Sequence, residues 1–331
     1  MERFALAAAV VLGFALTAAL CSLFVPLRRV LERREQNQQP VQPEQPRPVP
    51  LRAPLWGGLC AAAGTVAAVG VGWLAACVGQ PELLGSEGRL MTRLLTALAG
   101  SLAFGAVGLA EDLARMRSPA ALGLRRDVRL LLEALAAAFV LLLLQAAGCL
   151  PRGLDVPGAG YVLLGSAVPF LWAVLMVALA ECARIAERDE GTVCGAAFVA
   201  MLALMMAEAG LGVPGLAVLP AALAGALVAL LLWAFPPARL GVGCCGSLLA
   251  AGAIGCIPLS LDMTSLTVPL ALPFWAAGGL LAAQLLGAKR TGKPLRCWVK
   301  KHKMSPETVF LCSFVLSAVG YVLALALLRW C

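Results

Sequence analysis

Apolar runs of about 20 residues alternate with short polar segments along the whole chain. Each run is long enough to cross the hydrocarbon core of a bilayer as an α-helix. Lipid offers no hydrogen bonds to the backbone, so spanning segments must satisfy their own peptide groups as helices. The pattern predicts an all-α integral membrane protein with about ten transmembrane helices, in one polytopic domain over residues 1–331. The runs lie at 4–25, 56–77, 92–110, 129–149, 160–180, 191–208, 214–235, 245–262, 267–287 and 309–329.

Composition supports the membrane assignment. The chain is 61% hydrophobic and 13% charged, whereas soluble domains average about 45–50% apolar and about 25% charged residues. One segment differs: 36–50, QNQQPVQPEQPRPVP, is rich in Gln and Pro. Such a sequence cannot form a packed core, so we expect an extended linker there.

Basic residues gather in every second polar segment. Segments 28–52, 115–129, 184–188 and 289–303, together with Arg239, carry 21 of the 26 Lys and Arg residues. Because cytoplasmic loops carry the excess of Lys and Arg, we expect these segments in the cytoplasm and both termini outside. The net charge of +8 then lies mainly on the inner face. Attraction to anionic lipid explains this charge more simply than a phosphorylated substrate does, and we expect no nucleic acid partner.

The predicted cytoplasmic segments also hold the residues that could carry chemistry. RAPLWGGL opens the second run at 52–59, and GLAEDLARMRSPAALGLRRDVRLLLEAL covers 108–135. ECARIAERDEG lies at 181–191, PPARLGVGCCGSLLAAG at 236–252 and KRTGKPLRCWVKKHKMSPET at 289–308.

In order and content, these segments resemble the cytoplasmic loops of the polyprenyl-phosphate sugar-1-phosphate transferases (glycosyltransferase family 4 type), most closely the bacterial phospho-N-acetylmuramoyl-pentapeptide transferases. PLWGGL is similar to the family's Pro-Thr-Met-Gly-Gly turn. GLAEDLARMR and the later RRDVRLLLE resemble Gly-Phe-Asp-Asp-x-x-Lys and Lys-Leu-Leu-Leu-Gln. The segment 236–252 resembles Pro-Ala-x-x-Phe-Met-Gly-Asp-Thr-Gly-Ser-Leu. The resemblance covers nearly the whole chain.

The resemblance implies a transferase of the bacterial cytoplasmic membrane that makes a peptidoglycan lipid intermediate. Such enzymes move a sugar phosphate from a uridine diphosphate donor to undecaprenyl phosphate in the inner leaflet. Bringing two phosphates together requires positive charge from Mg²⁺ and basic side chains, and carboxylates to hold the metal. The implied partners are the membrane, undecaprenyl phosphate or a related inner-leaflet lipid, a nucleotide sugar and, as a homodimer, a second copy of the chain.

The resemblance also assigns roles to individual positions. Residual catalytic candidates are Glu111, Asp112, Glu187 and Glu190, and Asp112 is a weak metal ligand. The candidates for substrate binding are Arg115, Arg129, Arg184, Arg188, Arg296, Gly57, Gly58, Gly246 and Ser247.

Several positions depart from the family where it handles metal and phosphate. Cys244 stands at an expected Mg²⁺ ligand position, and a thiol is a weak, soft ligand for this hard ion. Glu181 and Arg184 replace two Asn, and the run Arg296, Cys297, Trp298 replaces three His. We therefore expect a diverged copy with lost or weak catalysis and a binding or regulatory role, a pseudoenzyme that needs Mg²⁺ only if it is active.

Two alternatives stay open. A working transferase could use Arg184, Arg188 and Arg296 for part of the charge that the metal supplies. A membrane transporter is the second alternative, although charges inside the predicted spans are nearly absent.

The same residues also have plainer explanations. The side chains of Glu181, Arg184, Glu187 and Arg188 could form ion pairs on a helix surface. Gly57 and Gly58 could serve only close helix packing. Glu133 could simply pair with Arg129, one turn earlier on its helix.

Overall fold

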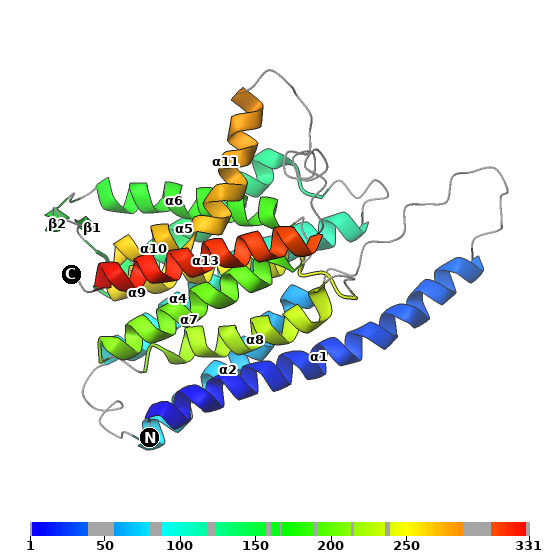
Figure 1. The fold of residues 1–331 in the computed structure, drawn as a ribbon, viewed down its shortest axis with the longest axis horizontal. Coiled ribbons are helices and arrows are strands. Elements are labelled where there is room, and N and C mark those ends of the chain that lie inside the picture. Colours follow the sequence, from blue (N-terminus) through cyan, green and yellow to red (C-terminus); the bar gives the residue numbers. More distant parts are fainter. Residues whose placement is uncertain are drawn as a thin grey trace.

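A computed structural model describes most of the chain as a bundle of long helices with one short β-hairpin (Figure 1). The account below concerns only the residues it describes, which are 2–38, 56–79, 88–117, 123–151, 153–156, 160–163, 165, 167–187, 191–212, 215–235, 239–286 and 306–328.

The first half of the bundle contains α1 (Glu2–Gln38), α2 (Gly57–Gly79), α4 (Gly88–Arg117), α5 (Arg126–Ala146) and α6 (Ala167–Ala186). The second half contains α7 (Thr192–Gly210), α8 (Val218–Ala234), α9 (Gly243–Leu261), α10 (Thr267–Leu270), α11 (Leu272–Leu286) and α13 (Pro306–Leu328).

Among the described residues, seven helices are long and apolar enough to cross a membrane. These are the apolar parts of α1, α2, α4, α6, α7, α9 and α13, and α8 is a shorter apolar helix. The predicted class, an all-α membrane protein of several spans, is therefore confirmed in its main feature.

α9 is the central helix of the bundle. Its apolar window is 100% buried, whereas that of α13 is only 17% buried. α4 packs most extensively against α9 and presents small residues to it. A Cβ atom on Gly108 would lie 2.2 Å from the carbonyl oxygen of Cys244, and one on Gly100 would lie 2.6 Å from Cys256 Sγ. Only glycine permits this approach, so the position of α9 against α4 is closely fixed.

The start of the fifth predicted span is wrong. A hairpin of β1 (Gly153–Val156) and β2 (Gly160–Leu163) precedes α6, with Val156 opposite Gly160 in an antiparallel register. The sequence between the strands begins Pro-Gly, a turn signal, and the run resumes with Tyr161 and Val162, which favour strands. An apolar run does not reveal by itself where a strand gives way to a helix.

The ninth predicted span, 267–287, is interrupted. A 3₁₀ turn, η1 (Thr264–Leu266), leads into α10, and Ala271 separates α10 from α11. Pro269 and Pro273 explain the break, because each lacks an amide donor and restricts the residue before it.

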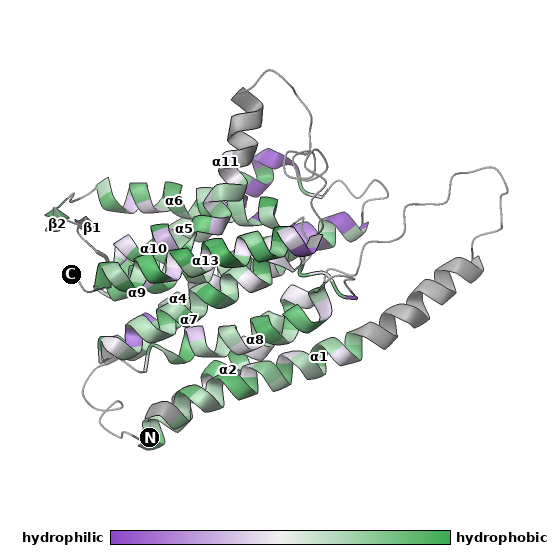
Figure 2. Ribbon diagram, viewed as in Figure 1, coloured by the Kyte–Doolittle hydropathy of each residue, from purple (hydrophilic) through white to green (hydrophobic). Residues whose placement is uncertain are grey.

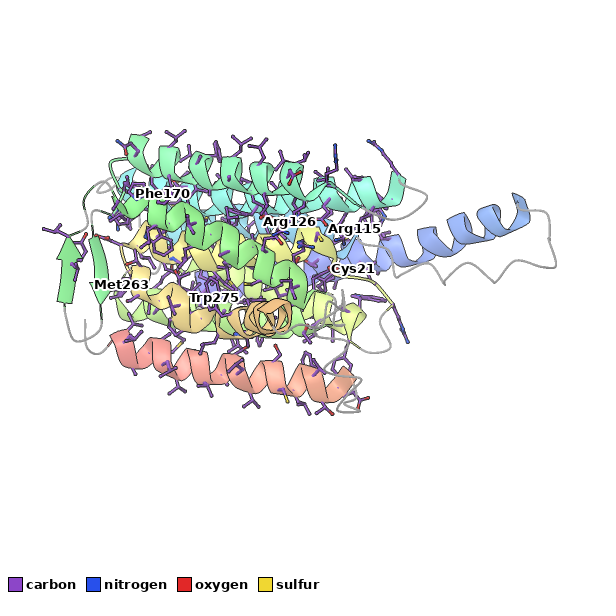
Figure 3. All side chains as sticks on the ribbon, turned by 90° about the horizontal axis from the view of Figure 1, so that it is seen from above. Cys21, Arg115, Arg126, Phe170, Met263 and Trp275 are labelled. Carbon is purple, nitrogen blue, oxygen red and sulfur yellow. The ribbon has the colours of Figure 1, made fainter. Side chains whose placement is uncertain are left out.

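Polar residues gather at the end of the bundle where α4 ends and α5 begins, which is termed the charged end below (Figure 2). Figure 3 shows Arg115 and Arg126 toward this end and Phe170 and Met263 toward the opposite one. α1 continues as a helix to Gln38, past the predicted run 4–25. The predicted linker 36–50 therefore begins within the last residues of α1, and its remainder lies outside the described residues.

Candidate functional site

The first turn of α9 forms the centre of the candidate site. The helix begins at Gly243, whose φ of 72° favours glycine. The amide of Gly58, at the start of α2, donates to the carbonyl of Val242 at 2.9 Å. A Cβ atom on Gly58 would lie 2.1 Å from the amide nitrogen of Gly246. α2 and α9 thus meet backbone to backbone.

Asp112 binds this turn from the side of α4. Its Oδ1 accepts a hydrogen bond from the amide of Cys244 at 3.0 Å, and its Oδ2 accepts one from Cys245 at 2.9 Å. First-turn amides have no partner within their own helix, and a carboxylate there also interacts well with the helix dipole. Asp112 is 1% exposed. Both of its oxygens are therefore engaged with backbone donors.

The thiol of Cys244 faces α6. It is buried, and its Sγ lies 3.9 Å from Oε2 of Glu187, just beyond the end of that helix. The position that the sequence resemblance assigns to a Mg²⁺ ligand therefore carries a sulfur atom beside a carboxylate.

A network of charges joins α4, α5 and α6. Arg129 Nε donates to Glu181 Oε1 at 2.7 Å, and Arg184 donates to Glu181 Oε2. Arg115 donates to Glu111 Oε1 at 2.6 Å, and an Arg129 nitrogen lies 3.8 Å from the same oxygen. The interpretation as ion pairs on one helix surface is therefore too narrow, because Glu181 and Glu111 both contact α5.

This network is not complete within the described part of the chain. Glu111 Oε2, both carboxylate oxygens of Glu133 and Arg184 Nε are buried without a hydrogen-bond partner there. Among the described residues, Glu133 is paired with Arg129, whose Nε is 4.0 Å away. Buried polar groups without a partner are costly, so these atoms mark where a ligand or protons would be accommodated.

Four carboxylates form ion pairs with three guanidinium groups in the described cluster. The carboxylates are those of Glu111, Asp112, Glu133 and Glu181, and the guanidinium groups are those of Arg115, Arg129 and Arg184.

The structure brings most of the predicted site residues together. Six of them, Glu111, Asp112, Arg115, Arg129, Arg184 and Glu187, lie at the charged end with Cys244. Gly58 and Gly246 belong to the contact between α2 and α9, and a Cβ atom on Gly57 would lie 2.5 Å from the carbonyl oxygen of Gly241, just before α9. Ser247 is buried and its hydroxyl donates to the carbonyl of Cys244 at 3.1 Å. Three predicted residues, Arg188, Glu190 and Arg296, lie outside the described residues.

Some contributors to the site were not predicted. The amide of Cys245 and the close approach at Gly108 involve backbone atoms, which a sequence motif does not display. Glu181 was predicted to replace a family Asn or to pair with a residue of its own helix, and no contact with another helix was predicted for it. The spacing of Glu181 and Arg184 signals their pair, but the contact with Arg129 joins residues 52 positions apart.

The described donors do not fit Mg²⁺. This ion requires oxygen ligands in near-octahedral geometry. No group of three or more His, Cys, Asp and Glu side chains among the described residues could hold a metal ion. Both Asp112 oxygens face amides, and Cys244 supplies sulfur.

Comparison with known proteins relates this arrangement to a family. The model of glycosyl transferase family 4 matches residues 94–262, the range in which α4, α5, α6 and α9 supply the charged residues and the central turn. A phospho-N-acetylmuramoyl-pentapeptide-transferase of Mycobacterium tuberculosis (strain ATCC 25618 / H37Rv) is 27% identical over 305 residues, 83% of either chain. One from Geobacillus kaustophilus (strain HTA426) is 25% identical over 309 residues, 92% of this chain and 89% of the relative. One from Synechococcus sp. (strain RCC307) is 30% identical over 212 residues, 63% and 55% of the two chains.

Proposed function

Because the chain belongs to glycosyl transferase family 4, we propose that it still binds a polyprenyl phosphate at the charged end but has lost, or largely lost, transferase activity. In this proposal the protein is a diverged relative of the phospho-N-acetylmuramoyl-pentapeptide transferases. Its role is to bind or regulate in the synthesis of peptidoglycan lipid intermediates.

One observation carries the loss of activity. Cys244 offers a thiol to Glu187, and the two oxygens of Asp112 are engaged by the first turn of α9. A thiol cannot replace an oxygen ligand of Mg²⁺. We therefore assign no Mg²⁺-dependent step to the protein as it stands.

The guanidinium groups support retained binding. Arg115, Arg129 and Arg184 meet at one end of the bundle, and all three are mostly buried. Arginine presents donors in a planar fork that suits phosphate oxygens. The proposed ligands are undecaprenyl phosphate or a related inner-leaflet lipid, and a nucleotide sugar.

The proposal includes a place for the protein in the cell. The chain lies in the bacterial cytoplasmic membrane with ten spans, both termini outside and the charged end in the cytoplasm. The positive-inside rule supports this orientation, since the charged end holds basic residues of segment 115–129. A homodimer is compatible with the proposal.

Reconstitution tests the function directly. The wild type is placed in liposomes with undecaprenyl phosphate, uridine diphosphate N-acetylmuramoyl-pentapeptide and Mg²⁺, and release of uridine monophosphate is followed. Loss of one electrostatic stabiliser commonly slows an enzyme by about 10²–10³-fold, so we expect turnover at least this far below a relative assayed in parallel. Turnover equal to that of the relative would contradict the proposed loss of chemistry.

A pair of variants locates the defect. Cys244→Asp restores a carboxylate at the central turn, and Cys244→Ser is the control of similar size without one. We expect release that depends on Mg²⁺ to increase in Cys244→Asp and not in Cys244→Ser. Binding of undecaprenyl phosphate is measured separately by native mass spectrometry, and its absence would contradict the binding function.

A further inference from the structure

The carboxylate of Glu181 lies between two guanidinium groups that come from different helices. Arg129 of α5 donates to one of its oxygens at 2.7 Å, and Arg184 of α6 donates to the other. Guanidinium groups bind phosphate oxygens in the same way as carboxylate oxygens, so the two arginines could hold a phosphate group in place of the Glu181 carboxylate.

Two further observations indicate that the carboxylate can be exchanged. The Glu181 side chain is 22% exposed, whereas those of Glu111 and Glu133 are 3% and 0% exposed. Arg184 Nε is buried without a hydrogen-bond partner among the described residues. A tetrahedral oxyanion has more acceptor oxygens than a carboxylate and could engage this donor as well.

We propose that Glu181 is an internal competitor for the phosphate site between Arg129 and Arg184, which a ligand phosphate must displace. A phosphate monoester binds between Arg129 and Arg184 by displacing the Glu181 carboxylate toward solvent. The inference rests on the proposed function and names the class of ligand that this site accepts.

The charge of a ligand determines how well it competes with the carboxylate. A phosphate monoester carries about −1.5 to −2 charges at pH 7, whereas a phosphodiester lipid headgroup carries one. Exchange of the singly charged carboxylate for a phosphodiester therefore gains little electrostatic energy, while exchange for a monoester gains more. Anionic phosphodiester lipids are the main competing ligands at a membrane surface, and the Glu181 carboxylate lowers their affinity for the site as it lowers that of a monoester.

The experiment compares two lipids in neutral phosphatidylcholine nanodiscs. Undecaprenyl phosphate and phosphatidylglycerol are titrated separately, and native mass spectrometry gives the affinity of the full-length protein for each. We expect the wild type to favour undecaprenyl phosphate by about 10-fold or more, the scale of one charge-assisted hydrogen bond. We expect Glu181→Gln to bind both lipids about 10-fold more tightly and to keep this preference, because displacement of the carboxylate costs both ligands the same free energy.

A matched variant controls for net charge. Asp127→Asn removes one negative charge in the exposed first turn of α5, at the same end of the bundle. We expect its affinity for each of the two lipids to equal that of the wild type. Glu181→Asn is the second test variant, and monodisperse elution with an unchanged melting temperature shows that each variant is folded.

Inorganic phosphate distinguishes two sources of the ligand group. If it displaces undecaprenyl phosphate, the phosphate group alone is recognised, and if it does not, the site is specific for the lipid phosphate. The affinities of Glu181→Gln for the two lipids decide the proposal in either case.

The results separate this inference from the proposed function. If the wild type binds undecaprenyl phosphate and the folded Glu181 variants bind it no more tightly than the wild type does, only the inference is overturned. If the wild type binds no undecaprenyl phosphate, the proposed function fails and the inference fails with it.

Discussion

Around the first turn of α9 the polar groups of the site are matched, whereas in the neighbouring charge network several are not. Asp112 has a backbone donor within 3.0 Å for each carboxylate oxygen. Glu133, equally buried, has no hydrogen-bond partner for either oxygen among the described residues. The region around the first turn of α9 is termed the finished half of the site, because its buried carboxylate is fully hydrogen-bonded. The charge network is termed the unfinished half, because it contains buried carboxylate oxygens without a hydrogen-bond partner among the described residues.

The origin of the two halves explains the difference. The first is built on backbone contacts at Gly58 and Gly108, which the packing of α2, α4 and α9 imposes. The second is built from long side chains on three helices, and these can change without moving the backbone. The comparison suggests that the helix arrangement is independent of the chemistry at the charged end.

The largest expected effect comes from adding one methyl group to the finished half. In Gly58→Ala, the new Cβ would meet the amide nitrogen of Gly246 at 2.1 Å and backbone atoms around it. Backbone cannot give way as a flexible side chain can, so we expect a loss of about 3 kcal/mol or more in the free energy of unfolding. Unfolding in mixed micelles of increasing SDS content measures it.

Gly70→Ala is the matched control for this prediction. Gly70 lies on the same helix, and a Cβ atom there meets nothing within 4 Å. Since alanine is the better helix former, we expect this variant to be as stable as the wild type or more stable by up to about 1 kcal/mol. Equal effects of the two substitutions would show that the contact of α2 with α9 is not tight.

The next effect concerns the hydrogen bonds of Asp112. In Asp112→Ala two buried amides lose their acceptor, and we expect the free energy of unfolding to fall by about 2–3 kcal/mol. Asp112→Asn keeps one acceptor oxygen and should lose less. Hydrogen exchange at the amides of Cys244 and Cys245, followed by mass spectrometry, should accelerate in the same order. Unchanged exchange in Asp112→Ala would contradict the role given to this carboxylate.

The sequence predicted the helical scaffold well because a bilayer imposes length and apolarity on every span. Each predicted apolar run overlaps a described helix. The hairpin at Gly153–Leu163 and the break at Ala271 were not predicted. Both occur inside apolar stretches, where local turn residues determine the backbone conformation.

The sequence predicted which residues belong to the candidate site, but it did not predict which groups they contact. The polar segments indicated that Asp112, Arg129 and Cys244 would meet at one end of the bundle. They did not indicate that Asp112 would bind the backbone of residues more than 130 positions away, or that Arg129 would hold Glu181. Such pairs depend on how helices are rotated and staggered, which the periodicity of one segment does not determine.

The smallest expected effect has the opposite sign and tests the unfinished half. Glu133 is fully buried, Nε of Arg129 is 4.0 Å from it, and its oxygens lack hydrogen-bond partners among the described residues. A buried charge without good partners costs more than an apolar side chain of similar volume. We therefore expect Glu133→Met to raise the free energy of unfolding by about 1 kcal/mol in the absence of ligand.

Glu111→Gln shows whether this gain is specific to Glu133. Glu111 is also a buried carboxylate of the network, but its Oε1 accepts a hydrogen bond from Arg115 at 2.6 Å. Its neutralisation weakens a charge-assisted bond, so this variant should be less stable than the wild type by about 1 kcal/mol. If Glu133→Met were destabilised as well, Glu133 would be a satisfied structural group, and the contrast between the two halves of the site would disappear.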